Sequence, residues 1–352
     1  MTRLAMTMVV RDEADVLEAN LQHHLRQGVD VVLVTDHASQ DATPEILERY
    51  ARAGAVTVLR EEADTLDQAT WVSRMARLAA VEHGADWVLN SDADEFWFPV
   101  AGTLKGALDA VPKRFGRLAV PRRDFVPRPG EEPFHERMVV RERESRNRRG
   151  DPLEPKAAHR ASPDVAIDHG NHAASGPGLG ALLPIPLLEI LHFPVRGYDQ
   201  FERKVIRAGL GYEALEDRPP DVGRDQLELL EIQRRGDLPQ HYADATLSEE
   251  QIRAGLDAGR LIVDRRVELS LGERPSSNGA AGLDPSDVAV VAMVRRMLDE
   301  LDRGAATAEE LREARRELEE TRVSLEALRG SRLIRLTRPA RRLYYRLRGG
   351  AV

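Results

Sequence analysis

The most informative absence in this 352-residue chain is that of cysteine. Without cysteine the protein can form no disulfide, use no thiol nucleophile and build no cysteine-based zinc site, and the redox state of its compartment stays open. No apolar stretch is long enough to span a bilayer, and residues 1–3 lead into a predicted strand without a signal-peptide pattern. The formal net charge of -8 argues against general nucleic-acid binding. We therefore expect a cytoplasmic globular enzyme.

Predicted strands and helices alternate along the first part of the chain. Apolar, β-branched runs predict strands at residues 4–10, 31–34, 55–59 and 85–91, and helical spacing of apolar residues predicts helices at 14–28, 43–50 and 68–83. Such alternation indicates an α/β protein with a mixed, mostly parallel sheet that is flanked by helices.

A pair of aspartates follows the fourth predicted strand. Asp92 and Asp94 are two residues apart, and side chains with that spacing on an extended strand share a face. Two neighbouring carboxylates repel unless a cation lies between them, and their hard oxygens suit Mg²⁺ or Mn²⁺. Open α/β sheets bind ligands at the carboxyl ends of their strands. The pattern predicts a metal–diphosphate site, and the alternative is an acidic turn after a core strand.

Three short motifs follow predicted strands: Arg11-Asp12-Glu13, Asp36-x-x-Ser39-x-Asp41 and Asp92-x-Asp94-Glu95-Phe96. Together they resemble the family 2 glycosyltransferases of the GT-A (Rossmann-like) fold, on the branch related to family 92. Later matches are Trp71 with Arg74, the Gly170-Asn171-His172 turn, and Leu191-His192-Phe193-Pro194-x-Arg196 followed by Phe201 and Lys204. The resemblance covers residues 1–215, which we expect to form one GT-A domain.

The resemblance implies that a nucleotide-diphosphate sugar lies across the ends of the first strands. Arg11 and Glu13 would lie near the nucleotide, and Asp36 would accept hydrogen bonds from the base or ribose. Asp92 and Asp94 would hold Mn²⁺ or Mg²⁺ against the two phosphates, where the ion stabilises the leaving diphosphate. Read from the residues alone, these positions could equally be a solvated helix start and a simple turn.

The second half of the site is less specific in sequence. His192 ends a short apolar run, so it either completes the metal shell or is a structural histidine. Arg196 and Lys204 follow it and are candidates for the diphosphate, or surface charges. Inverting transfer, which the resemblance implies, needs a base. The candidates are Asp124, Asp168 and Glu95, the last of which could instead support the ligand shell from behind.

The remaining segments differ in composition from the first 215 residues. Residues 137–149 mix arginine with glutamate and are predicted to form an exposed loop. Residues 216–303 are expected to form a C-terminal helical extension with a linker at 275–285, and residues 304–330 a coiled-coil-like helix. That helix, at 307–329, could form a homo-oligomer. Residues 331–352 are expected to form a basic tail, in which 331–348 suits the surface of an anionic membrane. The alternatives for this tail are a protein-docking helix and a nucleic-acid-binding arm.

These features favour a metal-dependent glycosyltransferase that acts on a glycan or lipid-linked acceptor of the cell envelope. Contact of the tail with a membrane would place the protein on the inner face of that membrane. Two alternatives stay open at this stage. A nucleotidyltransferase would use a similar sheet, but it usually has a glycine-rich loop where this chain has Arg11-Asp12-Glu13. A non-catalytic scaffold would act through the coiled coil and the tail.

Overall fold

The computed structural model describes residues 2–62, 67–215, 218, 222–272 and 285–303, with residues 313, 316, 317, 320 and 321. The described residues leave out 275–284 of the linker predicted at 275–285, nearly all of the predicted coiled-coil helix and the whole basic tail. Within the described part, no helix is both long and apolar enough to cross a membrane.

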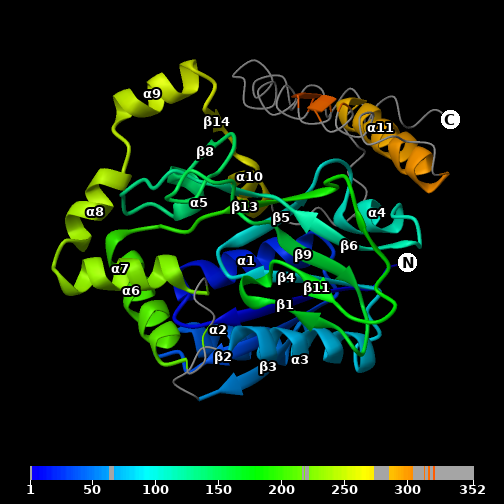
Figure 1. The fold of residues 1–352 in the computed structure, drawn as a ribbon, viewed down its shortest axis with the longest axis horizontal. Coiled ribbons are helices and arrows are strands. Elements are labelled where there is room, and N and C mark those ends of the chain that lie inside the picture. Colours follow the sequence, from blue (N-terminus) through cyan, green and yellow to red (C-terminus); the bar gives the residue numbers. More distant parts are fainter. Residues whose placement is uncertain are drawn as a thin grey trace.

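The core of the protein is a seven-stranded sheet with the order β12-β6-β9-β4-β1-β2-β3 (Figure 1). Its parallel half consists of β1 (Leu4–Val10), β2 (Val31–His37), β3 (Val56–Glu61) and β4 (Trp87–Asp92). The antiparallel β9 (Lys156–Arg160) separates β4 from β6 (Phe115–Val120), which pairs in parallel with β12 (Ala181–Leu183). The predicted α/β class with a mixed, mostly parallel sheet is confirmed.

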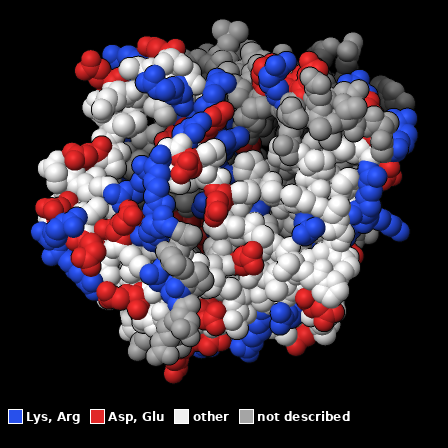
Figure 2. All heavy atoms as spheres, in the orientation of Figure 1, with Lys and Arg blue, Asp and Glu red and all other residues white. Residues whose placement is uncertain are grey.

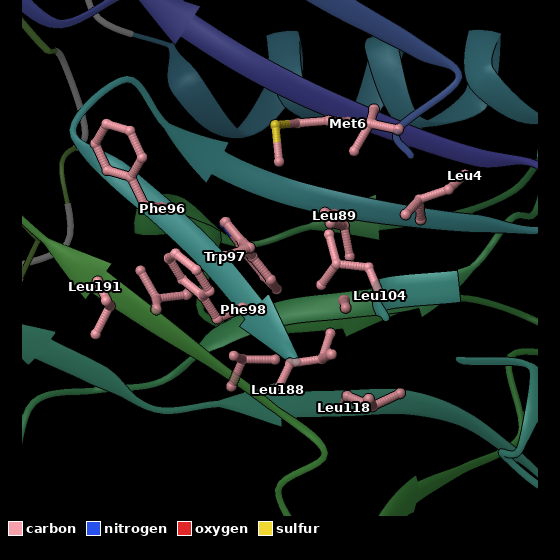
Figure 3. Packing of buried hydrophobic residues seen from close by; sticks show 14 of the residues in the cluster. Leu4, Met6, Leu89, Phe96, Trp97, Phe98, Leu104, Leu118, Leu188 and Leu191 are labelled. Atoms are coloured by element: carbon pink, nitrogen blue, oxygen red, sulfur yellow. The ribbon is translucent and has the colours of Figure 1, made fainter. Parts of the chain in front are cut away.

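Helices cover both faces of this sheet because successive strand residues point to opposite sides. Ala5 and Leu33 pack with residues of α3 (Gln68–Val81), whereas Met6 and Met8 belong to a second, larger cluster. That cluster includes residues of α1 (Ala14–Arg26) and α2 (Thr43–Arg52). Figure 3 shows its packing around Met6, Leu89 and Trp97.

A small second sheet has the order β5-β13-β7 and extends from the end of β4. Its strands are β5 (Glu95–Pro99), β13 (Leu188–His192) and β7 (Arg122–Asp124). In its register His192 lies opposite Glu95 on one side and opposite Asp124 on the other. The chain then leaves β13 and forms α6 (Tyr198–Glu213). This sheet therefore brings residues from three distant segments together beside the aspartate pair.

The connections and the C-terminal extension complete the described structure. Within residues 1–215 they are α4 (Leu104–Asp109), α5 (Phe134–Arg137), β8 (Val140–Glu142), β10 (Ala166–Ile167), the 3₁₀ turn η1 (His169–Asn171) and β11 (Ala174–Ser175). The extension consists of α7 (Arg224–Arg234), α8 (Leu238–Ala245), α9 (Glu249–Asp257), β14 (Leu261–Val263), α10 (Arg266–Gly272) and α11 (Pro285–Asp302). In Figure 1, α6 to α9 form one side of the molecule.

The prediction of an exposed loop at 137–149 is wrong for residues 140–142, whereas most of residues 143–149 are exposed and outside helices and strands. Residues 140–142 form β8, which pairs with β14 of the extension. Arg141 is fully buried because its guanidinium donates to Asp264, which lies just after β14. An arginine in a charged stretch appears exposed in a sequence, but a carboxylate more than a hundred residues away allows it to be buried.

Candidate functional site

The carboxyl ends of β1, β2 and β4 lie at one edge of the sheet. In the strand register Val10 lies opposite Asp36, and Val9 lies opposite Asp92. The residues that follow these positions surround a cleft of about 190 Å³, whose lining includes Arg11, His37 and Asp92. Figure 2 shows side chains of both charges gathered around a hollow in this face of the molecule.

The loop after β1 and the loop after β2 are hydrogen-bonded to each other. Asp12, in a left-handed conformation with φ of 53°, accepts hydrogen bonds from the backbone N–H groups of Gln40 and Asp41. Its own N–H donates to Ser39. Asp36 is buried at the end of β2, which is longer than the predicted strand, and its carboxylate accepts from the Ser39 N–H. Asp36 thus fixes this loop, and the next residue, His37, lines the cleft.

Three side chains hold Asp92 at the end of β4. Its Oδ2 accepts from Lys156 of β9, and its Oδ1 accepts from Gln68 at 3.2 Å and from Asn171 at 3.3 Å. Burial alone would raise the pKa of Asp92, but the Lys156 ammonium lowers it. Asp92 is therefore an ionised carboxylate with a fixed orientation, and 31% of its side chain is exposed.

Asp94 lies in the turn between β4 and β5, not on a continuous strand, and is 1% exposed. The Lys204 ammonium lies 2.5 Å from Oδ2, and the Arg196 guanidinium lies 3.6 Å from the same atom. His192 Nε2 is 3.5 Å from Oδ1. Burial would raise the pKa of Asp94, but Lys204 and His192 hold it well below its usual range.

His192 is oriented by a second carboxylate. Its Nδ1 lies 2.8 Å from Asp124 Oδ1 on the neighbouring strand β7. Burial alone would lower the pKa of His192, but Asp124 and Asp94 raise it to about 9. A carboxylate on one ring nitrogen that leaves the other directed at a ligand position is common around metal-binding histidines.

Asp94 and His192 together fit a divalent ion. Asp94 Oδ1 is buried and accepts no hydrogen bond from any residue that the structure describes. It faces His192 Nε2 at 3.5 Å. When an ion replaces the proton on this nitrogen, the two atoms are the hard and borderline ligands that Mn²⁺ or Mg²⁺ accepts. Across the described residues, no three His, Cys, Asp or Glu side chains group around one position. Two protein ligands with phosphate oxygens and water are the usual arrangement for Mg²⁺.

The turn that contains Asp94, between β4 and β5, is hydrogen-bonded to α1 through a fully buried asparagine. We call it the aspartate turn. Asn20 Nδ2 donates to the backbone carbonyls of Ala93 and Glu95, each at 2.8 Å. His24, one turn further along the helix, has Nδ1 at 2.8 Å from Asn20 Oδ1 and accepts the Trp97 N–H on Nε2. Both carbonyls that flank Asp94 therefore depend on one side chain.

We expect Asn20→Ala to destabilise the protein by about 1–3 kcal/mol, since it leaves two buried carbonyls without their donor. Urea unfolding measures this loss. Gln22→Ala, on the same helix but half-buried, is the matched control and should change stability by less than about 0.5 kcal/mol. Equal losses in the two variants would show that Asn20 does not brace the turn.

Other predicted residues lie behind the cleft wall. Arg196 is 3% exposed and bonds Glu13, Asp15 and the Phe193 carbonyl, so it ties the start of α1 to the end of β13 and has no free face for a diphosphate. Glu95 is fully buried, where its carboxylate accepts the Asp92 N–H and contacts Lys156 at 3.2 Å. This is the supporting position behind the aspartate turn.

Basic residues of α6 form one wall of the cleft. Arg203, Lys204 and Arg207 all line it, and they face Arg11 from the first loop. Arg207 forms an ion pair with Asp12. At the ends of β1 and β2 the Arg11 guanidinium lies 3.5 Å from His37 Nε2, and the His37 ring packs on Trp71 at 4.8 Å between centroids. The cleft thus offers cationic groups beside an aromatic pair.

Sequence reasoning missed Lys156, Gln68 and the role of Asn20. Lys156 is a single lysine in a segment with no motif, and it reaches Asp92 only because β9 inserts antiparallel beside β4. Gln68 opens α3 and looks like any polar first-turn residue. For Asn20 the sequence does offer a signal, because it is a polar residue on the otherwise apolar face of α1.

No protein-family model and no curated protein matches this chain. Among solved structures, S. aureus TarS 1-349 in complex with UDP-GlcNAc is 13% identical, with 91% of each chain covered and a TM-score of 0.39. The mannosyltransferase PcManGT from Pyrobaculum calidifontis, in complex with GDP-Man and Mn²⁺, is 16% identical over 93% of this chain and 87% of that chain, with a TM-score of 0.34. Glucosyl-3-phosphoglycerate synthase from Mycobacterium tuberculosis, with Mn²⁺ and UDP, is 15% identical over 34% and 44%, with a TM-score of 0.25. At these identities and TM-scores the similarities do not assign a function to this chain.

Proposed function

We propose that this protein is a glycosyltransferase that moves a sugar from a nucleotide-diphosphate sugar to an acceptor hydroxyl. The observation that carries this proposal is the convergence of Asp92 and a basic wall on one cleft, at the carboxyl edge of three parallel strands. Asp94 is buried beside this cleft, where it contacts Lys204 of the wall. Open α/β sheets bind nucleotides at this edge. The order and spacing of the motifs that resemble GT-A glycosyltransferases support the same function.

The wall on α6 suits the diphosphate. Arg203, Lys204 and Arg207 present guanidinium and ammonium groups to the cleft, and charge-assisted hydrogen bonds from such groups bind phosphate oxygens strongly. At the ends of β1 and β2, His37 and Arg11 would contact the nucleoside, and Glu13 lines the same cleft. Asp36 would act on the nucleotide through the loop that it fixes.

Asp94 and His192 would hold the Mn²⁺ or Mg²⁺ ion, which supplies positive charge to the departing diphosphate. Asp124 fixes the His192 ring through its Nδ1. Asp92 is committed to Lys156, Gln68 and Asn171, so its part is to shape the cleft beside the donor sugar. The two aspartates of the motif therefore have different tasks.

An inverting reaction is the one that the resemblance implies, and it needs a carboxylate free to take a proton. Glu95 is buried behind the turn, and Asp124 is engaged by His192. Asp168 is exposed on the loop that also carries Asn171, a partner of Asp92. Of the three candidates, we therefore assign the base to Asp168. The acceptor would be a glycan or lipid-linked hydroxyl.

Calorimetric titration of the protein with UDP, GDP, CDP and dTDP, with and without Mn²⁺, tests the proposed function. We expect one nucleotide to bind, and to bind more tightly with Mn²⁺, because the cleft combines an ion position with a basic wall. The corresponding nucleotide-sugar should then bind in the same way. If none of them binds, the proposal is wrong and a non-catalytic scaffold is favoured. If the protein instead prefers a nucleoside triphosphate together with a sugar phosphate, it is a nucleotidyltransferase.

A further inference from the structure

Lys204 lies between the cleft and the buried aspartate that would hold the ion. Its side chain is 41% exposed and lines the cleft, whereas Asp94 is 1% exposed. The Lys204 ammonium lies 2.5 Å from Asp94 Oδ2 and 4.0 Å from Glu13 Oε1. An ion that enters from the cleft therefore meets the lysine before it meets the carboxylate.

The other two cationic groups near Asp94 are fixed in place. Arg196 is buried and holds Glu13, Asp15 and a backbone carbonyl at the same time. His192 is anchored by Asp124. Lys204 has a flexible four-carbon stem and lines the cleft, so its ammonium can swing along the cleft. Such a swing would break its contact with Asp94 and give up the longer, 4.0 Å approach to Glu13.

We propose that Lys204 is an exchangeable counter-ion, which neutralises Asp94 until a divalent ion binds and then moves to the diphosphate of the donor. This inference rests on the proposed function. A buried carboxylate is costly without a positive partner, so the lysine leaves only when the ion replaces it. An ion on Asp94 Oδ1 repels the ammonium that lies on Oδ2 of the same carboxylate, and the displaced ammonium is stabilised when a diphosphate is there to receive it.

The exchange makes binding of the ion and of the diphosphate cooperative. Each ligand lowers the free-energy cost of the other, and such coupling must be reciprocal. For the wild-type protein this predicts weak Mn²⁺ binding alone and tighter binding with a nucleoside diphosphate. Lys204 thus has opposite effects on the two ligands, since it competes with the ion and attracts the phosphates.

Calorimetry of Lys204→Met measures both effects. We expect Mn²⁺ alone to bind about tenfold more tightly than to the wild type, because its competitor is gone. In saturating Mn²⁺, the nucleoside diphosphate that the wild type binds should bind about tenfold more weakly. Lys204→Arg keeps the charge and should leave Mn²⁺ affinity low. Lys105→Met is the matched control, since Lys105 pairs with Asp30 away from the cleft.

Mn²⁺ affinity that is unchanged or weaker in Lys204→Met would overturn the exchange, as would equal tightening in Lys105→Met. The Mn²⁺ titration uses no nucleotide, so it is independent of the donor. If the wild type binds none of the four nucleoside diphosphates, the proposed function fails. If it binds one and the Mn²⁺ affinity of Lys204→Met does not rise, the exchange alone fails.

Discussion

Asp94→Asn is expected to lower the rate of nucleoside diphosphate release from the donor by at least about a hundredfold, the usual cost of removing one group that stabilises developing charge. The carboxylate is buried among Lys204, His192 and Arg196, and its Oδ1 is the atom left for an ion. An amide keeps the shape of the side chain but carries no charge. The measurement is the initial rate of diphosphate release at saturating donor and Mn²⁺.

Two further variants make this result interpretable. Asp225→Asn removes an aspartate that pairs with Arg149 at the surface, and it should release diphosphate at the wild-type rate. Because Asp94→Asn also leaves buried cations without their counter-charge, Asp94→Asn/Lys204→Met restores part of the balance, and it should fold yet stay inactive. A folded Asp94→Asn protein whose rate stays within about tenfold of the wild type contradicts the role of Asp94.

Asp264→Asn is expected to lower the free energy of unfolding by about 3–5 kcal/mol, as when one partner of a buried ion pair is removed. Arg141 is fully buried, and its Nε donates to Asp264 at 2.8 Å. Arg266 donates to the same carboxylate at 2.6 Å. The amide leaves two guanidinium groups with no carboxylate in common, at the junction of β8 and the extension. Urea unfolding at pH 7 measures the loss.

The exposed ion pair between Asp225 and Arg149 also serves as the control for stability. Asp225→Asn should cost no more than about 1 kcal/mol, because its ion pair is solvent-exposed. A loss of that size for Asp264→Asn would show that the junction does not depend on this carboxylate.

Burial would raise the pKa of Asp264, but Arg266 and Arg141 lower it. Its contribution is therefore complete above the unfolded pKa of about 3.9 and is lost as the pH falls below that value. The variant should lack this part of the acid sensitivity.

The fold was predictable where local pattern decides structure. Residues 4–10 form β1 as predicted, and α3 begins at the predicted residue, because apolar spacing reports which face of an element is buried. The second strand extends to His37, three residues beyond its apolar run, because Asp36 and His37 pair with β3. Backbone pairing with a neighbouring strand can lengthen a strand through polar residues, and the pattern of apolar residues does not predict such an extension.

The site was only partly predictable, because like charges differ in burial. Arg196 and Lys204 looked equivalent in sequence as partners for a diphosphate. The fold places Arg196 behind the cleft wall, where it bonds Asp15, and leaves Lys204 on the cleft. Lys156 carries no local signal, since its partner Asp92 is 64 positions away. Contacts between distant segments, not residue types, separate binding groups from supporting ones.

A crystal structure with Mn²⁺ and the nucleoside diphosphate that binds most tightly, collected at the manganese absorption edge, tests the central claim most directly. We predict an anomalous peak in contact with Asp94 Oδ1 and His192 Nε2, phosphates against the α6 wall with Lys204 turned toward them, and the nucleoside beside His37. A peak at Asp92 alone, or a nucleotide outside the cleft, would contradict the account.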